Sequence, residues 1–151
     1  MFLTKECDYS IRVIRALADY QKKTAEEICD IEHIPYQFAY KVLKKLERAG
    51  FVQSLRGRDG GYLLIKSLDE LTILDIVSTI DKNLFVFECL KEDQFCPHKK
   101  AASPCAVHLE LDRIQAALIH EMRLHPIGEV LSQDEKATEA GISLGDTADQ
   151  V

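Results

Sequence analysis

Residues 51–65 read FVQSLRGRDGGYLLI, two short apolar runs on either side of a charged, glycine-rich centre. Apolar runs of this length separated by glycines predict the two strands of a β-hairpin, with a loosely held tip at residues 56–61. The preceding sequence predicts three helices, because apolar side chains recur every three or four positions. Three helices followed by a two-stranded hairpin make a winged helix-turn-helix.

The limits of these helices are marked by particular residues. Residues 3–20 carry the repeat of the first helix, with Ile14 and Leu17 on its buried face. Thr24-Ala25-Glu26-Glu27 has the form of a capping box, which predicts that a short second helix begins there. Pro35 suits the first position of the third helix, and Gly50 supplies a left-handed stop at its end.

The remaining chain divides into segments of different character. A further helix over residues 69–81 completes a winged-helix unit of residues 1–82. Residues 83–102 form a poorly periodic, cysteine-rich loop. Residues 103–133 contain a long helix, which we expect Ser103-Pro104 to cap, and residues 134–151 form a flexible acidic tail.

The long helix carries a narrow apolar seam. Its members step by four or three residues: Val107, Leu111, Ile114, Leu118 and Met122. A seam this narrow suits pairing with another helix, and a chain of this length has little else to cover it. We therefore expect a homodimer in which the long helix is the contact. The expected fold class is mainly α with a small β-hairpin.

Composition and charge indicate the class of protein and of partner. A chain of 151 residues with 46% hydrophobic and 29% charged side chains is typical of a folded protein. A charged start and no apolar run of about 20 residues predict a soluble, cytoplasmic protein without a membrane segment. The net charge of −6 is uneven, because residues 1–66 hold 12 basic and 9 acidic side chains. Residues 67–151 hold 7 basic and 16 acidic ones, which favours a basic DNA-facing module joined to an acidic one.

The third helix and the hairpin tip carry the candidate DNA contacts. In a helix-turn-helix, the N-terminal part of the second helix of the motif meets base edges. The side chains predicted to face bases are Tyr36, Gln37, Tyr40 and Lys41, and those predicted to lie nearer phosphates are Lys44 and Lys45. Arg56 and Arg58 at the tip are suited to a narrow minor groove, where negative potential is enhanced. Both elements together predict binding to double-stranded DNA.

Three cysteines lie within 17 residues, at Cys89, Cys96 and Cys105. Cys105 lies near a helix N-terminus, where a thiolate is favoured, and His108 follows it by three residues on the same helix face. Thiolates bind iron–sulfur clusters and zinc, but the Cys-x-x-Cys pairs of structural zinc sites are absent. On the residues alone, a cluster, zinc and unliganded thiols all remain open. Cys29 is expected to be a small buried side chain, and Cys7 a surface or reserve thiol.

The sequence also resembles a known family. The stretches Leu46-Glu47-Arg48-Ala49-Gly50-Phe51-Val52 and Arg56-Gly57-Arg58-Asp59-Gly60-Gly61-Tyr62-Leu63-Leu64 are similar to the Rrf2 family of bacterial regulators, which includes the IscR, NsrR, CymR and RirA types. The resemblance covers residues 1–132 and implies a homodimer on a palindromic operator. Its IscR- and NsrR-like members hold a [2Fe-2S] or [4Fe-4S] cluster, and sensing of iron, redox state or nitric oxide is therefore expected here.

The resemblance also implies the cluster ligands. The three family cysteines match Cys89, Cys96 and Cys105 in order, although the gaps of six and eight residues are longer than the common pattern. The fourth ligand is His108, by analogy with IscR-like members, or Asp8, by analogy with NsrR-like members in which an aspartate reaches across the dimer.

Two other functions compete with a cluster-bearing sensor. One is a repressor of the same family that works through thiols or through a partner protein, as the CymR type does. The other is a winged-helix module that binds protein instead of DNA. An enzyme is not expected, because the sequence shows no nucleophile–base constellation and no phosphate-binding loop.

Overall fold

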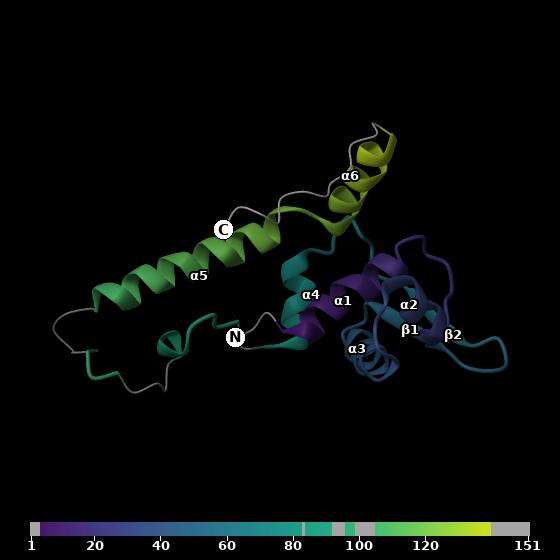
Figure 1. The fold of residues 1–151 in the computed structure, drawn as a ribbon, viewed down its shortest axis with the longest axis horizontal. Coiled ribbons are helices and arrows are strands. Elements are labelled where there is room, and N and C mark those ends of the chain that lie inside the picture. Colours follow the sequence, from purple (N-terminus) through teal and green to yellow (C-terminus); the bar gives the residue numbers. More distant parts are fainter. Residues whose placement is uncertain (1–3, 83, 92–95, 99–104, 140–151) are drawn as a thin grey trace.

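Three helices and an antiparallel hairpin come first along the chain, followed by a shorter helix, a 3-10 turn and two C-terminal helices (Figure 1). The structure, a computed structural model, describes residues 4–82, 84–91, 96–98 and 105–139. The expected class, mainly α with one small hairpin in a winged helix-turn-helix, is confirmed. The elements are α1 (Lys5–Ala16), α2 (Ala25–Glu32), α3 (Tyr36–Arg48), β1 (Val52–Leu55), β2 (Gly61–Leu64), α4 (Ile73–Ile80), η1 (Glu88–Leu90), α5 (Ala106–Leu124) and α6 (Ile127–Glu139).

The main core lies where α1, α2 and α3 meet. Apolar side chains spaced by three or four residues fall on one face of each helix and are removed from water there. The inward side chains with no more than 1% exposed surface include Val13 and Ile14 of α1, Ile28 of α2, and Ala39, Val42, Leu43 and Leu46 of α3. These four residues form the core face of α3, and its other face is left for solvent or a ligand.

The predicted ends of α2 and α3 agree with the structure, apart from a shift of one residue at the start of α3. Thr24 and Glu27 form the capping box, in which the Thr24 hydroxyl accepts from the Glu27 N–H and the Glu27 carboxylate accepts from the Thr24 N–H at 2.7 Å. Pro35 is the N-cap of α3 and not its first helical residue, so the helix begins one position later than predicted. Gly50 follows the helix with φ +76°, the left-handed conformation expected of it.

A short segment at Lys23 pairs with the two-stranded hairpin. β1 and β2 pair antiparallel from Val52 opposite Leu64 to Leu55 opposite Gly61. Tyr62 also exchanges two backbone hydrogen bonds with Lys23, at 3.0 and 2.7 Å. A Cβ at Gly61 would lie 2.8 Å from the Lys23 carbonyl oxygen, so only glycine allows this close approach.

The hairpin tip is tethered, which corrects the prediction of a loosely held tip. The Gly60 N–H donates to the Gly57 carbonyl at 3.0 Å, and the Lys22 ammonium donates to the Asp59 carbonyl at 2.6 Å. The prediction missed the second bond because Lys22 and Asp59 lie far apart in the sequence.

The C-terminal part departs most from the prediction. The long helix ends at Leu124, as expected, but α6 follows it and folds back onto the winged-helix unit. Ile127 is buried in the main core, and its N–H donates to the Leu71 carbonyl at 2.7 Å. Residues 134–139 belong to α6 and not to an irregular tail, because this packing stabilises a helix that the sequence pattern alone does not indicate. The rest of the predicted tail lies outside the described residues.

Two further predictions are refined. α4 begins at Ile73 and not at residue 69, because Thr72 and Asp75 form a second capping box. Cys105 is the N-cap residue of α5, whereas the expected cap, Ser103-Pro104, lies outside the described residues. In the described part of the chain, no helix is long and apolar enough to cross a membrane.

The capping box of α2 can be tested by mutation. Thr24→Ala removes the acceptor for the Glu27 N–H, and we expect it to lower the free energy of unfolding by about 1 kcal/mol. Urea titration followed by circular dichroism measures this. As a control, Thr79→Ala removes a hydroxyl that only bonds back to the Asp75 carbonyl within α4. It should change stability by less than about 0.5 kcal/mol, and equal losses in both variants would contradict the role of the cap.

Candidate nucleic-acid interface and cysteine segment

The outer face of α3 is rich in polar and aromatic side chains. Tyr36, Gln37, Tyr40, Lys41 and Lys44 are all exposed, as the sequence predicted. The Lys44 ammonium lies over the Tyr40 ring, 4.6 Å from its centroid. A cation held on an aromatic face in this way keeps its charge close to the helix surface.

The hairpin of β1 and β2, called the wing below, begins beside this face of α3. Burial raises the pKa of the Tyr62 phenol, and the neighbouring Tyr40, Glu47 and Tyr36 add to the shift. Glu47 of α3 accepts hydrogen bonds from the Ser54 N–H, at 3.3 Å, and from its hydroxyl. The Ser54–Glu47 hydrogen bonds join β1, and through it the paired strand β2, to α3. The sequence analysis did not assign Tyr62 or Glu47 a role, because each acts through a partner on another element.

The two wing arginines are available to a ligand. Arg56 and Arg58 are exposed, and neither is held by a carboxylate in the part of the chain that the structure describes. Lys22 adds a third positive charge at the tip, where its ammonium bonds the Asp59 carbonyl. Positive side chains on a tethered, glycine-containing tip suit contact with a polyanion.

Two of the predicted DNA-contacting lysines have an intramolecular partner. The Glu6 carboxylate of α1 contacts the Lys41 ammonium through one oxygen and the Lys45 ammonium, at 2.7 Å, through the other. Hydrogen bonds from Lys41, and then from Lys45, hold the pKa of the Glu6 carboxyl below its usual value. Lys45 also donates to the Ile80 carbonyl at 3.3 Å and is half-buried, so it faces α1 and α4 where the sequence predicted a phosphate contact.

Two of the three cysteines of the predicted cluster site are connected with α5. Cys89 belongs to η1, which packs against α5, and Cys105 is the N-cap of α5. All three, including Cys96, are free thiols and half-buried. Their donor chemistry fits an iron–sulfur cluster. Among the described residues, however, no three Cys, His, Asp or Glu side chains lie close enough to hold a metal ion.

The other candidate ligands are also apart. Asp8 is exposed on α1 and pairs with the Arg12 guanidinium at 3.1 Å, whereas His108 is half-buried on the first turns of α5. The structure therefore does not bring the predicted ligand set together. One described contact does join the cysteine segment to α5: the buried Gln115 side chain accepts from the Val86 N–H at 3.0 Å.

The two remaining cysteines differ from each other. Cys7 is 3% exposed, in a second core cluster with Leu74, Val77 and Met122, so the expectation of a surface or reserve thiol was wrong. Its position on the inner side of α1 explains the burial. Cys29 is half-buried against the main core, and burial raises the pKa of its thiol.

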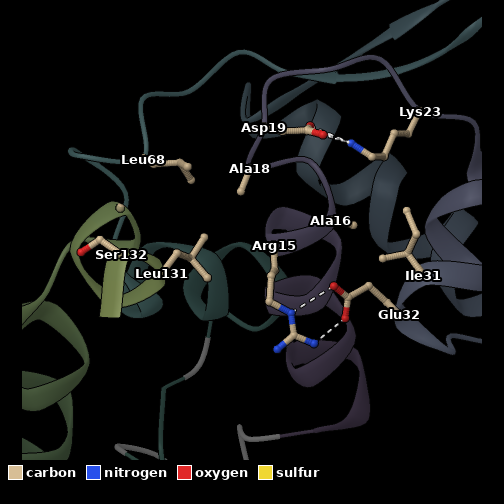
Figure 2. A pocket seen from close by; sticks show the side chains of 11 residues that line it. Arg15, Ala16, Ala18, Asp19, Lys23, Ile31, Glu32, Leu68, Leu131 and Ser132 are labelled. Atoms are coloured by element: carbon tan, nitrogen blue, oxygen red, sulfur yellow. Dashed lines mark hydrogen bonds and ion pairs between the residues drawn. The ribbon is translucent and has the colours of Figure 1, made fainter. Parts of the chain in front are cut away.

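A surface groove of about 670 Å³ lies between α1, α2 and α6 (Figure 2). At one end the Arg15 guanidinium bonds both oxygens of the buried Glu32 carboxylate, at 3.0 and 2.5 Å. At the other, Lys23 pairs with Asp19. Because these charges pair within the wall, the groove holds α2 and α1 together and presents little unpaired charge to a ligand.

Known proteins share the sequence pattern and the fold. The model of the Rrf2 family, described as an iron-dependent transcriptional regulator, matches residues 3–133. The HTH-type transcriptional regulator NsrR of Shouchella clausii is 29% identical over 140 residues, covering 89% of this chain and 92% of that protein.

Two solved structures have a similar fold. CymR, the global cysteine regulator of B. subtilis, aligns with a TM-score of 0.69 at 21% identity, covering 87% of this chain and 96% of CymR. IscR of T. potens aligns with a TM-score of 0.68 at 17% identity, covering 95% and 93%. The matched family model, together with the α3 face and the wing, shows that this chain belongs to the Rrf2 family of DNA-binding transcriptional regulators and is not an enzyme.

Proposed function

We propose that this regulator binds a palindromic operator in the cytoplasm as a homodimer, with α3 in the major groove and the wing in the minor groove. The observation that carries the proposal is the exposed polar face of α3, which the Glu47–Ser54 hydrogen bonds join to the hairpin. Tyr36, Gln37, Tyr40 and Lys41 would meet base edges, with Lys41 also within reach of a neighbouring phosphate, and Lys44 would meet a phosphate. Arg56 and Arg58 would enter the minor groove.

The apolar surface of α5 supports dimerisation. The C-terminal end of the predicted seam packs on its own chain, since Leu118 and Met122 belong to the second core cluster. Toward the other end, the seam residues Val107 and Ile114 are 66% and 39% exposed. Exposed side chains of this size along one helix favour burial against a second copy of the same helix.

We further propose that Cys89, Cys96 and Cys105 hold an iron–sulfur cluster, with His108 or Asp8 as the fourth ligand. When bound, the cluster would supply a group that reacts with iron status, oxidants or nitric oxide. Cys105 starts α5, and Val86 near Cys89 is bonded to Gln115 of α5, so ligands on both segments would be tied to the dimer helix. In this division of labour, residues 1–82 read DNA and residues 83–133 sense and dimerise.

A cluster-free regulator is the second candidate. The described residues leave the cysteines as separate, half-buried thiols, and the fold is also that of CymR. In this alternative the same cysteines respond directly as thiols, or a partner protein controls the regulator.

The wing can be tested through the salt dependence of DNA binding. Replacing Arg56 and Arg58 with alanine should weaken binding to double-stranded DNA and reduce the slope of log K against log salt by about 0.9 for each phosphate that the variant no longer neutralises. Fluorescence anisotropy across a salt series measures both quantities. Arg113→Ala removes a positive charge from exposed α5 and should change affinity less than about twofold, because that charge is screened from DNA. An unchanged affinity in the wing variant would count against the proposed wing contact.

The cluster can be tested by iron and sulfide analysis after anaerobic reconstitution. The parent protein should bind iron and acid-labile sulfide and absorb visible light, and replacing Cys89, Cys96 and Cys105 with serine should abolish all three signals. Cys29→Ser is the matched control, because Cys29 packs against the main core. A parent protein that takes up no iron, with DNA affinity unchanged by reconstitution, would establish the cluster-free alternative.

A further inference from the structure

Helix α3, the recognition helix of the proposed interface, carries more positive charge than is free to contact DNA. Of its lysines, Lys44 extends over Tyr40, whereas Lys41 and Lys45 both contact the Glu6 carboxylate of α1. Glu6 is 17% exposed, which brings its charge close to the base of the recognition surface. One acidic side chain therefore offsets two candidate DNA-binding cations.

Glu6 is held firmly in this position. The Ser10 hydroxyl donates to the Glu6 carbonyl at 2.6 Å within the first turns of α1. The next residue, Cys7, is buried against Met122 of α5 and Val77 of α4. The packing of Cys7 holds this part of α1 against α4 and α5, and from there the Glu6 carboxylate reaches Lys41 and Lys45 of α3.

We propose that Glu6 is a positioning residue for DNA binding, which holds Lys41 and Lys45 on the α1 side of α3 and so lowers the affinity for DNA. The inference deepens the proposed function, since it rests on α3 being the surface that meets DNA. A phosphate that approaches Lys41 must compete with the carboxylate for the ammonium and also meets the negative charge of Glu6.

Lys41 and Lys45 respond differently when the Glu6 carboxylate no longer holds them. The Lys41 side chain is 59% exposed, so its ammonium can turn toward a phosphate once the carboxylate is neutral. Lys45 is 29% exposed and keeps the Ile80 carbonyl as an acceptor. Lys41 is therefore the cation that Glu6 withholds, one in each protomer.

The test compares Glu6→Gln with the parent protein on a labelled mixed-sequence duplex of about 30 base pairs, which is long enough for both reading helices of a dimer to bind one turn apart. Neutralising Glu6 should tighten binding roughly three- to tenfold at low salt and steepen the log K against log salt slope by about 0.9 for each additional phosphate that is neutralised. A purely structural role for Glu6 predicts weaker binding instead. Glu110→Gln removes the same charge from α5, where Glu110 pairs with Arg113, and should leave affinity and slope near the parent values.

Two further variants separate contact from net charge. Glu6→Asp keeps the charge but shortens the side chain by one methylene, so it should lie between the parent and Glu6→Gln in affinity. It also serves if Glu6→Gln does not fold. Lys41→Gln should cost more affinity in the Glu6→Gln background than in the parent, because only there is Lys41 fully released.

Each outcome has a distinct meaning. Tighter binding and a steeper slope in Glu6→Gln, with non-additive loss at Lys41, support the proposal. Unchanged or weaker binding in Glu6→Gln, or a gain matched by Glu110→Gln, overturns it. If Lys41→Gln and the wing variant nevertheless weaken binding, the proposed DNA interface stands without the role of Glu6. If neither weakens binding, the interface itself is wrong.

Discussion

The inner face of α3 fixes the orientation of everything that this protein presents to DNA. Ala39, Val42, Leu43 and Leu46 have no exposed surface, so the helix cannot turn about its axis without exposing apolar side chains. A rotation by one residue, about 100°, would carry the outer face into the core. These four buried residues therefore determine which side chains of α3 face a DNA groove, although they do not contact DNA themselves.

Helix α1 links this constraint to the rest of the molecule, because it packs against α2, α3 and α4. Its charged residues face different neighbours: Arg15 bonds the buried carboxylate of Glu32, and Glu6 contacts two lysines of α3. Removing Arg15 is costly, because it leaves the charge of the buried Glu32 carboxylate unpaired. These ion pairs set the relative placement of helices as well as their stability.

Local patterns in the sequence predicted the local structure well. The capping box at Thr24 and the stop at Gly50 each depend on neighbouring residues, and each was confirmed. The wing was predictable because its glycines lie between two apolar runs. The DNA-facing side of α3 followed from its periodicity.

The differences from the prediction come from contacts between distant segments. The partner of Lys45 is 39 residues away on α1, and the partner of the Val86 N–H is 29 residues away on α5. Helix α6 forms where Ile127 enters a core built by other elements. Placement of the candidate cluster ligands depends on such contacts too, and on a second protomer in the case of Asp8. Sequence order and spacing identify the donor atoms but do not show where in the fold those atoms come together.

Helix α5 is anchored at its C-terminal end and can act as a lever about that end. Near Pro126 the chain is fixed to the winged-helix unit by hydrogen bonds from Ile127 to Leu71 and from Gly128 to Leu68. The 19 residues of α5 place Cys105 about 28 Å from that pivot, so a displacement of about 3 Å there corresponds to a rotation of about 6°. In a dimer with half-sites about 34 Å apart, a 6° rotation moves each reading helix by about 2 Å. That distance is enough to break hydrogen bonds to base edges, so in the proposed dimer a small rearrangement around the cysteines would change the contacts with DNA.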